Sequence, residues 1–148
     1  MRDLTKLVHP FPAQMVEKNP TGYGTYVSHP VVQQRLFDVL GCPPDTTVVQ
    51  ILRGTAPGKG SADPIPDAVV GVVLRMTVEI DGRAVSVEEA GDCELPSNWT
   101  TDGARLKDAM SDAYKRCAMR LGVGLHLWAQ EHFYISEKML KADEGAEA

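Results

Sequence analysis

The sequence predicts an α+β domain in which a short antiparallel sheet of about three strands carries helices packed on one face. Between Val70 and Ile80 every even position is apolar, which is the alternation of a strand with one face on a core. Asp81-Gly82 follows at once, and this dipeptide is preferred in the tight turn of a hairpin. From Asp102 to Leu121 apolar residues recur at spacings of three and four, as they do along one side of a helix. A length of 148 residues suits one such domain with its own core.

The two ends of the chain are predicted to lie outside this domain. Residues 1–24 contain prolines and glycines at short intervals, so they predict an N-terminal arm with at most a short helical turn around residues 13–18. The core domain is expected over residues 25–135. Residues 136–148 are acidic, and we expect a disordered tail there.

The first helix is predicted over residues 31–40. Pro30 suits the first helical turn, because the amide hydrogen that proline lacks has no partner there in any helix. Gly41 stops the helix, and two prolines follow it. The apolar residues that fall on one face of this helix are Val32, Leu36, Val39 and Leu40.

Three strands are expected next. Residues 48–53 are rich in β-branched side chains and predict a short strand, and the glycines and prolines of residues 54–67 predict a mobile loop after it. The alternating segment 70–80 is the second strand, and its apolar even face packs on the core. After the hairpin turn, Val85 and Val87 alternate with polar residues on the returning strand.

The second helix is predicted over residues 102–121, with Gly122 ending it. Its predicted apolar stripe consists of Leu106, Met110, Ala113, Cys117 and Leu121. At 100° per residue, charged residues gather on the opposite side and Arg120 lies at the edge of the stripe. The residues expected on that charged side are Arg105, Asp108, Asp112, Lys115 and Arg116.

Charge is distributed unevenly along the chain, whose formal net charge is -5. Residues 79–94 hold six acids against one arginine, whereas residues 105–120 hold five bases against two acids. A basic helix in an acidic protein has two interpretations. It is a solvated face with ion pairs, or it is a strip that binds the phosphates of a nucleic acid.

Several protein classes lack support in the sequence. Cys42, Cys93 and Cys117 form no Cys-x-x-Cys pair, which fits a reducing compartment, and the scattered histidines offer no metal-site spacing. The longest apolar run, residues 69–76, is interrupted by a glycine and an arginine, so no membrane span is expected. Residues 1–8 show no secretory signal. We therefore expect a cytoplasmic protein with no metal and no cofactor.

The sequence contains no complete catalytic motif, so we expect the chain not to be an enzyme. The segment from Gly54 to Gly60 has glycines and a lysine like a phosphate-binding loop, but its spacing is wrong and no Ser or Thr follows Lys59. Lys59 remains a candidate contact for a DNA backbone. A metal-dependent nuclease needs clustered acids with a nearby lysine, and the acidic segments 79–81 and 88–90 lack that lysine. No nucleophile elbow is present either.

Residues 108–124 read Asp-Ala-Met-Ser-Asp-Ala-Tyr-Lys-Arg-Cys-Ala-Met-Arg-Leu-Gly-Val-Gly. This segment resembles the signature helix of the Rad-fifty-two superfamily of single-strand annealing proteins, including phage Sak-type and bacterial DdrA-like members. Residues 74–91 are similar to that family's paired strands, which end in an acid and a glycine, and residues 26–41 are similar to its aromatic strand followed by a helix. Together the resemblance spans about residues 22 to 128, in the family's order.

The resemblance implies a homo-oligomeric ring that holds single-stranded DNA in a basic groove and anneals complementary strands without ATP, in homologous recombination or DNA repair. Lys115 and Arg116 match the pair that contacts the DNA backbone in the family. Further candidate contacts on this chain are Arg120, Lys107, Arg105, Arg53, Arg75 and Lys59. Pro30 stands near the place where the family often has an arginine, and Arg35, Arg53 or Arg75 are candidates to replace it.

Other functions stay open at this point. The chain could protect DNA ends without annealing them, or form an oligomeric scaffold that binds no DNA, and a nuclease is a third alternative. A partner nuclease or single-strand-binding protein is possible in a recombination system.

Overall fold

The computed structural model describes residues 4–20 and 24–135. The chain divides into two compact units. One, here called the sheet unit, runs from Pro44 to Cys117. The other, here called the terminal unit, combines the residues up to Pro43 with those from Ala118 onward. The predicted acidic tail at 136–148 lies outside the described residues.

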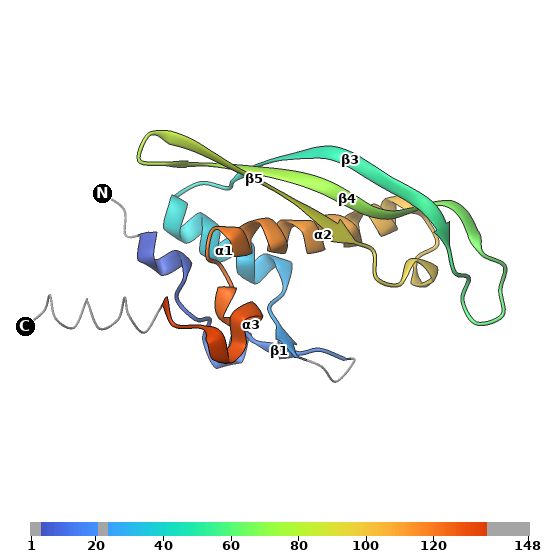
Figure 1. The fold of residues 1–148 in the computed structure, drawn as a ribbon, viewed down its shortest axis with the longest axis horizontal. Helices are drawn as coiled ribbons and strands as arrows, with labels where there is room; N and C mark the ends of the chain where they lie inside the picture. The colour runs from blue at the N-terminus through green and yellow to red at the C-terminus, as the bar shows by residue number, and fades with distance from the viewer. Residues whose placement is uncertain (1–3, 21–23, 136–148) are drawn as a thin grey trace, which may run out of the picture. The chain divides into compact units, whose positions relative to one another are not determined.

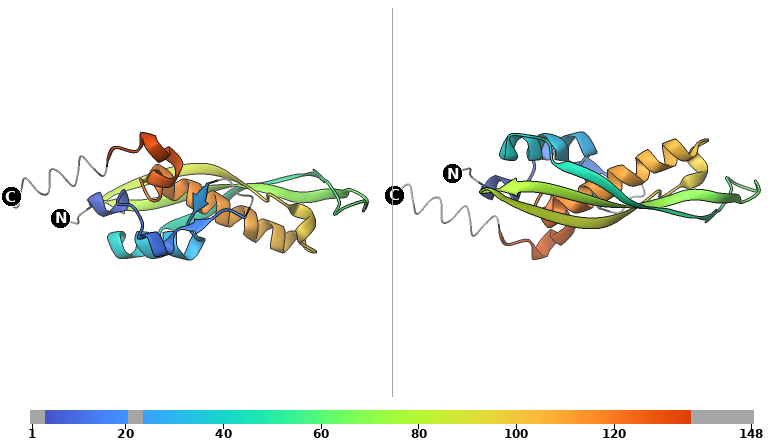
Figure 2. Two further views of the ribbon diagram at one scale, coloured as in Figure 1. Left: turned by 90° about the horizontal axis from the view of Figure 1, so that it is seen from below. Right: turned by 90° about the horizontal axis from the view of Figure 1, so that it is seen from above.

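The sheet unit contains three long strands and most of one helix (Figure 1). Strands β3 (Asp45–Ala56), β4 (Ile65–Ile80) and β5 (Arg83–Asp92) form an antiparallel sheet in the order β3-β4-β5. Helix α2 (Asp102–Arg120) runs along one face of this sheet (Figure 2). A short 3₁₀ turn, η3 (Pro96–Asn98), precedes the helix. The α+β class and the three-stranded antiparallel sheet are thus confirmed.

The β4–β5 hairpin follows the predicted pattern closely. Asp81 and Gly82 both have positive φ, at 52° and 76°, which is the requirement of a type I′ turn. The turn sets the register, with Ile80 opposite Arg83. The alternation of β4 is confirmed as well, because the side chains that it buries most deeply on the α2 side include Val72, Leu74, Met76 and Val78.

The predicted loop at residues 54–67 is too long, and the predicted strand at 48–53 is too short. Strand β3 continues to Ala56 and β4 begins at Ile65, which leaves only residues 57–64 as the connection. The two strands stay paired through Gly54 opposite Ala68 and Ala56 opposite Ile65, with a register shift between these pairs. Such a bulge lets a strand accommodate a glycine and the nearby Pro66 without ending.

Helix α2 packs on the sheet through small residues. Ala109, Ala113 and Cys117 are completely buried, and the Sγ of Cys117 donates a hydrogen bond of 3.6 Å to the carbonyl of Leu74. A Cβ atom on Gly91 of β5 would collide with backbone atoms of Ala109 and Ala113. The glycine therefore permits this close approach of helix and strand.

The predicted apolar stripe of α2 is correct only in part. Ala113 and Cys117 are buried, whereas Leu106, Met110 and Leu121 are only partly buried. Because the backbones of α2 and β5 approach closely, the centre of the contact admits small side chains, and the longer ones remain at its margin.

The terminal unit holds helix α1 (His29–Leu40) as predicted, with Val32, Leu36, Val39 and Leu40 buried. Gly41 caps α1 in the left-handed conformation and donates its amide to the Phe37 carbonyl at 2.8 Å. The unit also contains the 3₁₀ turns η1 (Leu4–Leu7), η2 (Ala13–Met15) and η4 (Gln130–His132), strands β1 (Glu17–Lys18) and β2 (Thr25–Tyr26), and helix α3 (Leu125–Ala129).

The N-terminal segment has more structure than an arm with one helical turn. The turn expected around residues 13–18 is the short η2, followed directly by β1, which pairs with β2. Leu7 and Phe11 are buried, so the segment contributes side chains to the core of the terminal unit. Prolines at 10 and 12 prevent a longer helix, but they do not prevent the apolar residues beside them from packing.

The three cysteines differ sharply in accessibility, which predicts their reactivity. Cys42 is exposed, whereas Cys93 and Cys117 are buried thiols. Burial, reinforced by the Asp108 carboxylate, raises the pKa of Cys93 from 9.0 to about 11, which lowers its thiolate fraction roughly a hundredfold. At pH 8 we expect a thiol reagent to label Cys42 rapidly and the other two only on unfolding. The variant Cys42→Ser should lose the fast phase, and a second fast thiol in wild type would contradict the packing described.

Candidate nucleic-acid interface

The candidate DNA-binding residues of α2 do not form one uniform basic face. Lys107 and Arg120 are exposed, and Lys115 and Arg116 are partly exposed. Lys107 and Lys115 are eight residues apart, so they lie within about 80° of each other around the helix axis. These four cations reach the surface of α2, with Arg120 in its last turn.

Arg116 is positioned by a carboxylate that also binds the sheet. Its Nε lies 3.1 Å from Oδ2 of Asp112, one helical turn earlier. The same oxygen accepts the amide of Asp92, at the end of β5, at 2.9 Å. The Arg116 side chain remains 38% exposed, so the guanidinium is oriented by Asp112 but still reaches solvent. An anchored cation of this kind loses less conformational entropy when it binds a phosphate.

Arg105, in contrast, is buried, and its predicted position on the charged side of the helix is wrong. The residue is only 7% exposed. Its Nε donates to the Pro96 carbonyl at 2.9 Å and its Nη2 to the Trp99 carbonyl at 2.7 Å. Its Nη1 contacts Asp102 at 3.1 Å. Because the segment before α2 folds over the first helical turn, the guanidinium holds that segment in place and does not face solvent.

Asp102 is a structural residue that the sequence analysis did not identify. One of its carboxylate oxygens accepts the Val69 amide at 3.2 Å and contacts Arg105, and the other accepts Arg53 Nη1 at 3.0 Å. The Val69 hydrogen bond, followed by the Arg53 hydrogen bond, lowers the pKa of Asp102. Two predicted DNA contacts, Arg53 and Arg105, thus converge on one acid. The sequence contained one signal for a structural role of Asp102, because an acid in the first turn of a predicted helix interacts favourably with the helix dipole.

Arg75 lies on the sheet face that is opposite α2. It forms an ion pair of 2.8 Å with Glu88 on β5, its register partner. By strand alternation, the same face carries three further acids beside these two residues: Asp45, Glu79 and Asp92. This excess of acids over bases disfavours a phosphate next to Arg75. Arg75 is therefore separated from the basic residues of α2.

Lys59 and Arg35 are the remaining candidate DNA contacts. Lys59 is exposed in the connection between β3 and β4, where its carbonyl accepts the Ala62 amide at 3.0 Å. Arg35 donates to two main-chain carbonyls of the N-terminal segment. Arg35, Arg53 and Arg75, the three candidates to replace the family arginine near Pro30, all make contacts within the chain.

Strand β3 is an edge strand with exposed apolar side chains. Val48, Val49 and Ile51 are 40%, 44% and 41% exposed. Within the described residues β3 pairs only with β4, so its outer edge presents main-chain donors and acceptors. Exposed edges of this length are normally covered or interrupted by charges, because they otherwise pair with another chain.

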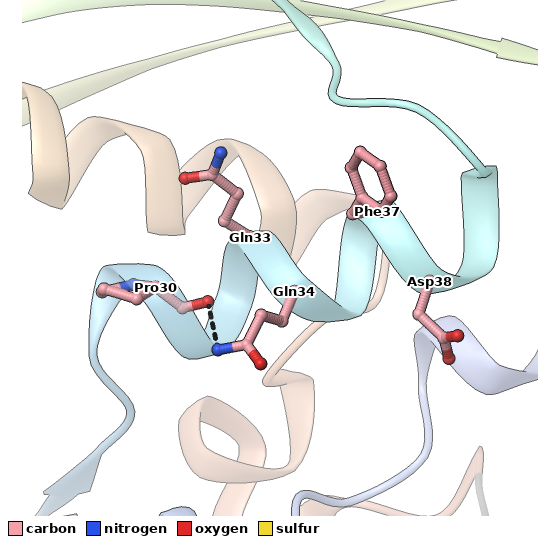
Figure 3. Close-up of a pocket in the computed structure, with 5 residues that line it drawn as sticks. All are labelled: Pro30, Gln33, Gln34, Phe37 and Asp38. Atoms are coloured by element: carbon pink, nitrogen blue, oxygen red, sulfur yellow. Dashed lines mark hydrogen bonds between the residues drawn. The ribbon is translucent and has the colours of Figure 1, made fainter.

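A shallow groove lies along α1 in the terminal unit (Figure 3). Its volume is about 590 Å³, and Pro30, Gln33, Gln34, Phe37 and Asp38 line it. Gln34 Nε2 donates to the Pro30 carbonyl at 3.2 Å. The single charged residue in this lining is acidic, so the groove has no attraction for a phosphate backbone.

In residues 4–20 and 24–135, no group of three or more His, Cys, Asp or Glu side chains is arranged to hold a metal ion. No helix in the same residues is both long and apolar enough to cross a membrane. Comparisons with protein-family models, curated proteins and solved structures find no match to this chain.

Proposed function

We propose that this chain binds single-stranded DNA through Lys115 and Arg116 of α2, and that a homo-oligomeric ring of such chains anneals complementary strands without ATP. The observation that carries the proposal is the different placement of the arginines and lysines. Arg105 is buried, and Arg75 lies on the acidic sheet face that is opposite α2. Lys115 and Arg116 lie next to each other on the signature-like helix and are partly exposed, with the Arg116 guanidinium oriented by Asp112.

The chemistry of annealing agrees with cations of this kind. Strands can pair only when the protein holds the sugar-phosphate backbone and leaves the base edges accessible. Lysine and arginine supply such sequence-independent, salt-sensitive affinity. One chain contributes few surface cations and has a net charge of -5, so a single site is expected to be weak. Repeating the site around an oligomer raises the overall affinity through effective concentration.

The edge of β3 supports self-association. A twelve-residue edge strand with Val48, Val49 and Ile51 exposed is unfavourable in an isolated chain, because apolar surface and unpaired main-chain groups both face water. Pairing with another copy would remove this cost. A ring in which this edge is buried against a different surface of the next copy would also place one α2 per copy at regular intervals.

The decisive test is the double variant Lys115→Ala/Arg116→Ala, with Lys6→Ala/Lys18→Ala as the control that removes equal charge elsewhere. We expect the first variant to lose about tenfold or more in affinity for a labelled single-stranded oligonucleotide, because two phosphate contacts disappear, and to show a weaker salt dependence. Acceleration of duplex formation should fall in parallel. The control should behave like wild type.

Other outcomes separate the alternatives. Binding without faster duplex formation would indicate protection of DNA ends. Loss of assembly in the Lys115→Ala/Arg116→Ala variant, from a wild type that never bound DNA, would indicate a scaffold. Cleavage of the oligonucleotide in Mg²⁺ or Mn²⁺ would indicate a nuclease. A monomeric wild type that ignores single-stranded DNA in dilute salt would contradict the proposal entirely.

A further inference from the structure

The ring of His126 lies between two phenylalanines in the terminal unit. Its centroid is 6.0 Å from that of Phe11, in the N-terminal segment, and 5.9 Å from that of Phe133, which follows η4. The imidazole thus joins the first and last described segments of the unit through aromatic contacts.

Arg35 of α1 also contacts the Phe11 ring. Its guanidinium carbon lies 4.2 Å from the centroid of the Phe11 ring. Its Nη1 also donates to the carbonyls of Lys6 and His9, at 2.9 and 2.7 Å. One cation therefore binds residues 6–11 to α1 by two hydrogen bonds and a cation–π contact.

No carboxylate in the described contacts offsets a positive charge on His126. Its Nδ1 is buried without a hydrogen-bond partner, and the Nε2 of His9 is buried in the same way. Arg35 is the charged group that acts on His126, and it is a cation. Glu131 and His132 of η4 pair with each other at the exposed surface, 3.8 Å apart. Burial, followed by repulsion from Arg35, lowers the pKa of His126 below its usual 6.5.

We propose that His126, Phe11 and Arg35 form a pH-sensitive latch that holds the N-terminal segment on α1 and α3 when His126 is neutral and releases it when His126 is protonated. This inference is independent of DNA binding. The folded state binds the proton on His126 less well than an open state does. The latch is therefore fully closed above about pH 6.5, and it weakens as the pH falls through the pKa of His126 in the folded chain. Each pKa unit of depression corresponds to about a tenfold change in the opening equilibrium.

Hydrogen exchange on the full-length chain tests the latch. We expect amide protection in residues 4–11 and 125–133, corrected for intrinsic exchange rates, to fall between pH 7.5 and pH 5.5 in wild type. The variant His126→Phe keeps an aromatic ring that cannot be protonated, so its protection should stay constant over this range. His132→Asn, at the exposed histidine, should retain the wild-type dependence. Protection that is independent of pH in wild type, or equally dependent in His126→Phe, would overturn the proposal.

A second measurement keeps the test valid if His126→Phe folds poorly. Proton NMR titration of wild type should show the His126 ring titrating below the usual histidine pKa of 6.5. A pKa of His126 at or above that value would refute the latch.

Discussion

Replacing Gly91 by alanine should destabilise the sheet unit by about 3 kcal/mol or more, which is the upper range for overpacking a close contact. A Cβ atom at this position would fall on the backbone of Ala109 and Ala113, and backbone atoms cannot rotate away as the end of a side chain can. Helix α2 would have to shift away from β5. For a chain of this size we expect the melting temperature to fall by roughly 10 °C.

Gly103 provides the matched control. It lies in the first turn of α2, and a Cβ atom there would meet no heavy atom within 4 Å. Gly103→Ala should therefore be neutral or stabilise the fold by up to about 1 kcal/mol, since alanine is the better helix former. Thermal unfolding followed by circular dichroism distinguishes the two variants. Equal stability for Gly91→Ala and wild type would mean that α2 does not pack on β5 as described.

The second large effect is expected for Arg105→Gln. The substitution removes the guanidinium that donates to the Pro96 and Trp99 carbonyls, and it weakens the cluster around Asp102. Because these hydrogen bonds are part-buried and come from a charged donor, each contributes about 1–2 kcal/mol, and we expect a loss of roughly 2–3 kcal/mol in unfolding free energy. Affinity for single-stranded DNA, measured where the variant is folded, should change little.

Lys107→Gln is the control for Arg105→Gln, because it removes one charge from an exposed position of the same helix. Its stability should stay within about 0.5 kcal/mol of wild type, as for most surface substitutions. If Arg105→Gln weakened DNA binding while leaving urea unfolding unchanged, Arg105 would be a ligand contact and the buried cluster would be wrong.

Features with local signals were predictable from the sequence. Helix α1 has Pro30 in its first turn and Gly41 at its end, and the structure buries the four apolar residues that periodicity selects. The hairpin turn follows from Asp81-Gly82, since few residue pairs accept positive φ at two successive positions. Each of these signals acts within a few residues of the chain.

Only the tertiary structure decided the lengths of the strands and the packing face of α2. The pairing of Ala56 with Ile65 continues the sheet through a segment whose glycines and prolines predict a loop. The burial of small residues on α2 depends on Gly91, which is some twenty residues away from Ala113 in the sequence. No periodicity within the helix contains that information.

For the candidate DNA interface, too, one part was predictable from the sequence and another was decided by the tertiary structure. The sequence by itself determined that a basic helix follows an acidic hairpin, and its resemblance to an annealing family selected Lys115 and Arg116. The tertiary structure decided which cations remain at the surface. Arg105 is buried because two carbonyls from a preceding segment and Asp102 surround it, and Arg53 is drawn to the same acid. The two carbonyls belong to the irregular segment before α2, which a helical projection does not include, and Asp102 lies 49 residues from Arg53 in the sequence.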